Sequence, residues 1–152
     1  MCIRDRLETV NIGEATTEIQ EYDCWLTAGE EIDLEVESST ARAFKPDTVV
    51  AKSLGTVVAL YAFAGKSNNM KFVFIGTPVN IYRREWQEML STLVNEANVL
   101  FIQQSLDRMG TIHDLRKILP VESEVVEVPG KDHLYNDVEV LSAAIESWFN
   151  RT

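Results

Sequence analysis

Three residues whose side chains could together perform nucleophilic chemistry each follow a segment that predicts a β-strand: Ser53, Asp107 and His133. A hydroxyl, a carboxylate and an imidazole are the groups that activate a serine when they contact one another in series. Binding sites in open parallel sheets gather at the carboxyl ends of the strands. We therefore expect these three side chains to meet at one edge of a parallel sheet.

Ser53 lies between a short apolar run that begins at residue 48 and a helix-compatible run that begins at Leu54. This layout is typical of a nucleophile elbow, where the pattern G-x-S-x-G places a serine on a tight turn between a strand and a helix. Small neighbours allow the bend, although Ala51 replaces the first glycine of the pattern. The N–H of Leu54 could donate to a developing oxyanion. Lys52 could tune the site electrostatically, or it could be only a surface neighbour.

Two other interpretations of this stretch compete with the elbow. Residues 51–53 resemble the end of a phosphate-binding loop, but Pro46 and Ala51 occupy the places where that loop needs glycine. A second Gly-Lys-Ser sequence, at residues 65–67, also lacks the first glycine and follows a predicted helix. The remaining alternative is an ordinary strand-to-helix turn in which Ser53 caps the helix.

Segments that predict strands alternate with segments that predict helices. Short apolar or β-branched runs indicate strands at residues 7–21 (as one strand or two), from 48 to the turn at Ser53, and at 71–75, 99–102 and 124–128. Helices are predicted at 28–44, 54–64, 81–97, 111–119 and 137–149. This alternation implies an α/β fold with right-handed crossovers, a mainly parallel sheet and helices on both faces.

Helical spacing also predicts which faces are buried. Helix 81–97 presents large residues that indicate a core face rather than a ligand cage: Tyr82, Trp86, Met89, Leu90, Leu93 and Val94. In helix 137–149 the predicted inner side consists of Val140, Leu141, Ala144, Ile145 and Trp148. The acids of helix 28–44 could be metal ligands, but a solvated helix face explains them better. These acids are Glu30, Glu31, Asp33, Glu35 and Glu37.

Composition narrows the class of protein. A chain of 152 residues fits one domain that can bury a core. Its apolar fraction of 45% and charged fraction of 25% are ordinary for a globular protein. The net charge of −10 argues against nucleic acid or an anionic membrane as the main partner, since both favour basic patches. No apolar run is long enough to span a bilayer.

Three segments carry a resemblance to the α/β-hydrolase superfamily, and in particular to its small, capless serine hydrolases. They are Ala-Lys-Ser-Leu-Gly-Thr around Ser53, Val-Leu-Phe-Ile-Gln-Gln-Ser-Leu-Asp-Arg-Met-Gly around Asp107, and Val-Pro-Gly-Lys-Asp-His ending at His133. The chain order of nucleophile, acid and histidine is also that of this superfamily. The similarity extends over roughly residues 23–149.

The resemblance implies a role for each residue. Ser53 would attack a carbonyl carbon, and His133 would take its proton and later deliver it to the leaving group. Asp107 would hold the imidazole in the required tautomer and stabilise its cation. The intermediate would be an acyl-enzyme on Ser53, which water clears.

Each of these assignments has an alternative. Asp107 could instead cap the following helix, and Asp114 and Asp132 are other candidate acids. His133 could be a loop residue with no chemical role. The second histidine of the chain, His113, is predicted to face solvent from a helix and is therefore the weaker candidate.

The first residues are treated separately. Residues 1–6 read Met-Cys-Ile-Arg-Asp-Arg, which resembles a translated sequencing adapter, and we exclude them from fold reasoning. Residues 7–152 are then interpreted as the C-terminal portion of a single α/β-hydrolase domain. Because no His-Gly-type loop precedes residue 7, we expect the first strand or strands and the second oxyanion donor to be missing. Cys24 is then the only native cysteine, which fits a reducing, cytoplasmic compartment.

The resemblance implies a serine hydrolase that cleaves a carboxylic ester, thioester or amide in a small-molecule acyl substrate, without a metal or cofactor. Two other functions stay open. A catalytically inactive module of the same fold could bind a small ligand or a protein. An acyltransferase could use the same three residues with an acceptor other than water.

Overall fold

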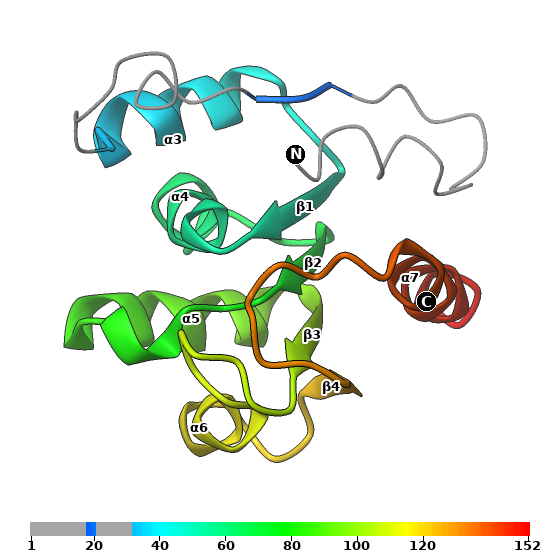
Figure 1. Cartoon of the computed structure of the whole chain (residues 1–152). Coiled ribbons are helices and arrows are strands. Elements are labelled where there is room, and N and C mark those ends of the chain that lie inside the picture. The colour runs from blue at the N-terminus through cyan, green and yellow to red at the C-terminus, as the bar shows by residue number, and fades with distance from the viewer. Residues whose placement is uncertain (1–17, 21–31) are drawn as a thin grey trace.

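The computed structural model describes residues 18–20 and 32–152, and its centre is a parallel sheet (Figure 1). The described strands are β1 (Thr48–Lys52), β2 (Lys71–Ile75), β3 (Asn98–Gln104) and β4 (Glu124–Val128). They are ordered β1-β2-β3-β4, and each neighbouring pair is parallel. The described α-helices are α3 (Leu34–Ala43), α4 (Leu54–Phe63), α5 (Arg84–Glu96), α6 (Ile112–Ile118) and α7 (Val138–Phe149). A 3₁₀ turn, η1 (Val79–Ile81), precedes α5.

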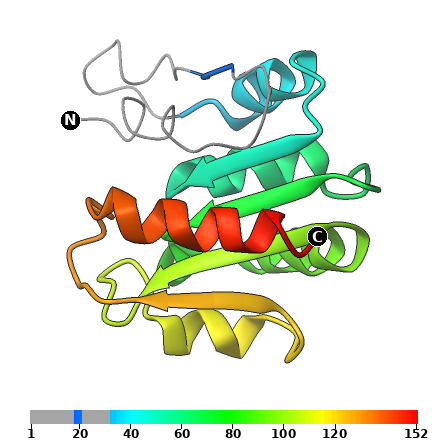
Figure 2. The same cartoon turned by 90° about the vertical axis from the view of Figure 1, so that its right-hand side faces the viewer.

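Helices cover both faces of the sheet, as the sequence predicts. Helices α4, α5 and α6 lie on one face and α7 lies across the other (Figures 1 and 2). Alternate residues of β2 pack into the cores on the two faces of the sheet, because successive side chains of a strand point to opposite faces. Phe72 and Phe74 pack in the core under α4 and α5, whereas Val73 and Ile75 pack in the core under α7. A strand buried on both faces therefore reads as a continuous apolar run.

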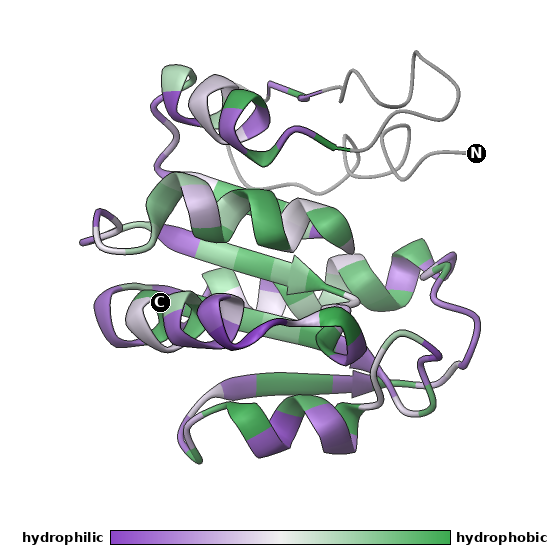
Figure 3. Ribbon diagram, turned by 90° about the vertical axis from the view of Figure 1, so that its left-hand side faces the viewer, coloured by the Kyte–Doolittle hydropathy of each residue, from purple (hydrophilic) through white to green (hydrophobic). Residues whose placement is uncertain are grey.

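Helix α4, which follows the predicted elbow, is deeply buried. Most of its length is coloured as hydrophobic in Figure 3, and residues 55–60 are all buried. It contacts β1 and α5, and α3 packs against it. Such surroundings suit a helix that is apolar nearly all round. Because α4 is enclosed, its first turn, which follows Ser53, is held in a fixed position against the sheet.

Some predicted boundaries are wrong by a few residues. Helix α3 begins at Leu34, because the Asp33 carboxylate accepts two N–H groups of the first turn, each at 3.1 Å. Residues 28–31 of the predicted helix lie outside the described residues. Helix α5 begins at Arg84 rather than at residue 81, because η1 comes first. Strand β3 continues through Gln104, although Gln103 and Gln104 were predicted to lie in a loop.

Two predicted faces also need correction. Glu37 is only 5% exposed and accepts a 2.6 Å hydrogen bond from the Gln20 side chain, so it does not belong to a solvated face. Val140 is 38% exposed, because it lies one position away from the buried stripe of Leu141 and Ile145 on α7. Most of the strand predicted at residues 7–21 lies outside the described residues. Its described part, residues 18–20, has no regular secondary structure. Residues 1–6 and Cys24 also lie outside them.

No helix within residues 18–20 and 32–152 is both long enough and apolar enough to cross a lipid bilayer.

The layer between the sheet and α7 should contribute strongly to stability. Replacing the fully buried Leu100 of β3 by alanine should lower the free energy of unfolding by about 2–5 kcal/mol, since it leaves a cavity under α7. Val121, which is 99% exposed, provides the control, and Val121→Ala should change that free energy by less than about 0.5 kcal/mol. Urea unfolding measures both variants. Equal losses of unfolding free energy in the two variants would contradict the packing of Leu100 under α7.

Candidate active site

The structure brings the three candidate residues together at the carboxyl edge of the sheet. Ser53 follows β1, Asp107 lies in the loop after β3, and His133 lies in the loop after β4. The Ser53 Oγ lies 2.8 Å from the His133 Nε2. The Nδ1 of the same ring lies 2.8 Å and 2.9 Å from the two carboxylate oxygens of Asp107. Hydroxyl, imidazole and carboxylate therefore form one hydrogen-bonded series, with Asp107 only 1% exposed.

Ser53 occupies a strained backbone conformation, with φ 53° and ψ −124°. A non-glycine residue in such a region costs about 1–3 kcal/mol, which the surrounding structure must offset. Ser53 precedes α4 at the N-cap position, but its side chain makes no capping hydrogen bond. The interpretation of Ser53 as an ordinary helix cap is therefore wrong, because the hydroxyl faces His133 instead.

Hydrogen bonds to the serine backbone hold this turn in place. The Ser53 N–H donates to the carbonyl of Ile75 on the neighbouring strand at 3.0 Å. The Ser53 carbonyl accepts from both the N–H and the hydroxyl of Thr56, at 2.9 and 2.7 Å. Because the Thr56 hydroxyl proton is used in this way, Tyr82 donates to the same hydroxyl oxygen at 2.9 Å. Burial raises the pKa of Tyr82, so it remains a donor.

Leu54 is the first residue of α4. The N–H groups of a helix's first turn have no acceptor within the helix. An unpaired donor immediately after the nucleophile is what an oxyanion requires. The position of Leu54 is thus compatible with the predicted donor role.

The loop geometry separates Asp107 from the other candidate acids. Asp107 does not cap α6, because Thr111 and Asp114 form a reciprocal capping box there. Hydrogen bonds from Lys117 and Thr111 lower the pKa of Asp114 to about 2. Asp132 instead accepts from the Leu134 N–H at 2.9 Å, and this bond lowers the pKa of its carboxyl group. The His133 imidazole bonds to Asp107.

Two glutamines that were not predicted to be part of the site join its loops. The amide oxygen of Gln103 accepts from the Thr77 N–H at 2.9 Å, and its nitrogen donates to the Gly110 carbonyl. The amide oxygen of Gln104 accepts from the His133 N–H at 3.0 Å. The one available signal in the sequence was that both polar residues directly continue the apolar run of a strand. The Gln104 side chain fixes the loop that carries His133, and the Gln103 side chain fixes the segment that follows Asp107.

Two further polar candidates are His113 and Lys52. His113 is exposed on α6, as predicted. Lys52 ends β1, directly precedes Ser53 in the sequence and is half-buried. No group of three or more histidine, cysteine, aspartate or glutamate residues suited to a metal ion occurs within the described residues.

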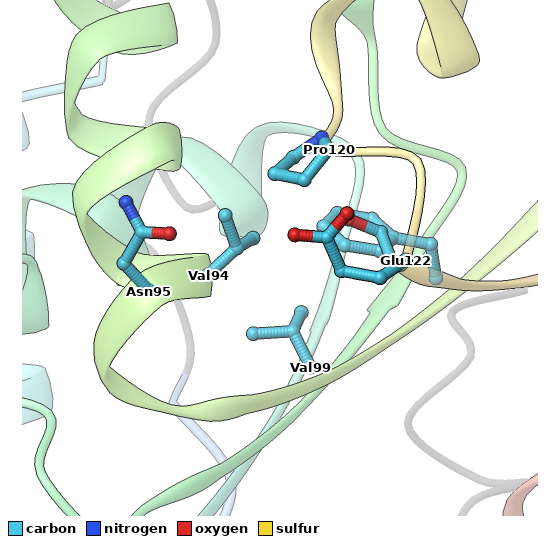
Figure 4. Close-up of a pocket in the computed structure, with 7 residues that line it drawn as sticks. Val94, Asn95, Val99, Pro120 and Glu122 are labelled. Atoms are coloured by element: carbon cyan, nitrogen blue, oxygen red, sulfur yellow. The ribbon is translucent and has the colours of Figure 1, made fainter.

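A small pocket lies at the other end of the sheet (Figure 4). It is lined by residues from the end of α5, the first half of β3 and the segment before β4, among them Val94, Val99 and Pro120. These segments precede or begin strands, whereas Ser53 follows one. Since sites in open parallel sheets gather at the carboxyl ends, this pocket is not part of the candidate active site.

Comparison with known proteins bears on the fold. No protein-family model matches the sequence, and no curated protein is significantly similar to it. An esterase domain from a Rhodothermus marinus protein is similar in structure, with a TM-score of 0.57 and 18% identity over 82% of this chain and 69% of that chain. TT1662 from Thermus thermophilus has a TM-score of 0.47 and 15% identity over 76% of this chain and 60% of that chain. The likeness to the esterase domain shows a shared fold, and the chain has a partial α/β-hydrolase-like fold.

Proposed function

We propose that the chain is a serine hydrolase that cleaves a carboxylic ester, thioester or amide through an acyl-enzyme on Ser53. The observation that carries the proposal is the series of contacts from Ser53 through His133 to Asp107, each at hydrogen-bond distance. Two features around this series support it: the serine stands on a strained turn, and its hydroxyl is not used for capping. Strain of this kind clusters at active sites.

Each step follows from the position of the three groups. The His133 Nε2 removes the Ser53 proton as the oxygen attacks the carbonyl carbon of the substrate, and Asp107 stabilises the imidazolium that forms. The N–H of Leu54 donates to the oxyanion. His133 then protonates the leaving group, and the carbon–leaving-group bond breaks. Water, deprotonated by the same imidazole, releases the acid and restores Ser53.

Esters are the first substrates to test. The structurally similar Rhodothermus marinus chain is described as an esterase domain. An activated ester also has a good leaving group, so its hydrolysis depends mainly on attack by the serine. Failure with esters and thioesters, from a chain that folds, would favour a binding module of the same fold.

Replacing Ser53 by alanine removes the attacking oxygen alone. We expect kcat/KM for a short p-nitrophenyl ester to fall by roughly 10⁴-fold or more, measured by release of nitrophenolate. Ser105→Ala is the matched control, because Ser105 lies in the same loop as Asp107 and its hydroxyl donates to Glu127 at 2.7 Å. This control should keep the wild-type rate. Hydrolysis that persists unchanged in the Ser53 variant would reject the proposal.

Replacing Asp107 by asparagine keeps the shape of the side chain but gives it an N–H₂ group that can donate to the imidazole. The wrong tautomer of His133 is then favoured, and kcat should fall by about 10³–10⁴-fold. Asp132→Asn is the comparison, because its remaining carbonyl oxygen can still accept from the Leu134 N–H. Steady-state kinetics should show a much smaller loss for this variant. If both variants lost activity equally, Asp107 would not be the acid.

A further inference from the structure

We propose that Tyr135 is a positioning residue that fixes the Asp107 carboxylate and thereby sets how strongly His133 holds a proton. This inference rests on the proposed function of the same site. Tyr135 lies two residues after the histidine and is 3% exposed. It is not a catalytic residue in this proposal, because it acts on the serine only through Asp107 and His133.

The direction of the Tyr135 hydroxyl bond follows from its two partners. Its oxygen accepts a hydrogen bond from the Gln104 backbone N–H at 2.9 Å. The same oxygen lies 2.7 Å from the Asp107 Oδ2, and an ionised carboxylate can only accept. The phenol must therefore donate its proton to Asp107. One side chain thus ties the end of β3 to the acid.

The Tyr135 ring packs against the His133 ring and next to Gly76. His133 and Tyr135 both have left-handed backbone conformations, with φ of 65° and 54°, and their rings meet edge-on at 5.9 Å between centroids. Gly76, after β2, leaves the space that the ring fills. A Cβ on Gly76 would lie 2.5 Å from the Tyr135 Cε2 and 3.2 Å from the His133 Cε1. The ring is thus positioned by loops from three strands.

The Asp107 carboxylate has a small, defined set of donors. The Met109 N–H donates to one oxygen at 2.8 Å, Tyr135 donates to the other, and the His133 Nδ1 lies within 2.9 Å of both. Burial, and next the hydrogen bond to Asp107, raise the pKa of Tyr135, so the phenol stays protonated while it donates. A donor of this kind draws charge from the carboxylate, and that charge stabilises the imidazolium.

Charged groups next in sequence to the three residues of the series come from several elements. They are Lys52 at the end of β1, Arg108 beside Asp107, and Lys131 and Asp132 in the loop of the histidine itself. The Asp132 carboxylate accepts hydrogen bonds from the Leu134 N–H and from the Gln104 side-chain amide. Asp107 bonds the imidazole and Tyr135 touches its edge. The Tyr135 hydroxyl bonds to the Gln104 N–H and to Asp107, and of these two partners Asp107 is the one that bonds the imidazole, so a change confined to this hydroxyl should reach the ring through Asp107.

Tyr135→Phe removes the hydroxyl and keeps the ring against Gly76. The carboxylate then holds more charge and stabilises the imidazolium more strongly. The acid limb of the kcat/KM profile should therefore move to higher pH by about half a unit or more. Activity near pH 6 should fall further than activity near pH 8. Tyr61→Phe is the matched control, since the hydroxyl of Tyr61 on α4 bonds to Trp86 and Glu85, both on α5, and this variant should leave the profile unchanged.

A second measurement does not depend on turnover. The chain has two histidines, so NMR titration can follow the His133 ring proton against His113 as an internal reference. The His133 midpoint should move upward in Tyr135→Phe, while that of His113 stays in place. An unmoved His133 midpoint, with a uniform loss of activity at every pH, would overturn the positioning role.

The two proposals can fail separately. A folded wild-type chain that hydrolyses no ester rejects the proposed function, whereas the NMR titration still tests the effect of Tyr135 on His133. If Tyr135→Phe does not fold, the wild-type chain provides the remaining test. Its Tyr135 hydroxyl proton should be shielded from exchange and visible at low field, because it is donated to a buried carboxylate. A rapidly exchanging hydroxyl would overturn the inference.

Discussion

The interaction on which the rest of the site depends is the contact between the buried Asp107 carboxylate and the His133 imidazole. A carboxylate that is 1% exposed is costly unless its oxygens have donors, and here a backbone N–H, a phenol and the imidazole supply them. These donors come from two loops that follow neighbouring strands. The parallel pairing of β3 with β4 brings the two loops to the same edge, so the sheet's register is what makes the contact possible.

The strained serine depends on the same architecture from the other side. Its conformation is unfavourable in isolation, and it is held by backbone hydrogen bonds to Ile75 on β2 and to Thr56, whose hydroxyl in turn bonds to Tyr82. Tyr82 precedes α5, which packs against α4. The energy that maintains the turn therefore comes from the core between these helices and the sheet. A loss of packing there would free the Ser53 hydroxyl from its position beside His133.

Much of this could be predicted from the sequence, for identifiable reasons. Strands β2 and β4 have the predicted bounds, and Ser53, Asp107 and His133 share an edge because each follows a strand of one parallel sheet. The glutamines and Tyr135 were missed because their partners are distant in the sequence. The position of Tyr135 also depends on left-handed backbone conformations at His133 and at Tyr135, on either side of Leu134, which side-chain propensity does not indicate.

We expect the contact with His133 to make the Ser53 hydroxyl more reactive than the other hydroxyls of the chain. Reaction with a fluorophosphonate probe, followed by mass spectrometry of the peptides, measures this reactivity directly. One adduct per chain should form, on Ser53, at neutral pH, and none should form when the protein is unfolded first. A folded chain with no adduct, or with adducts spread over several serines, would contradict it.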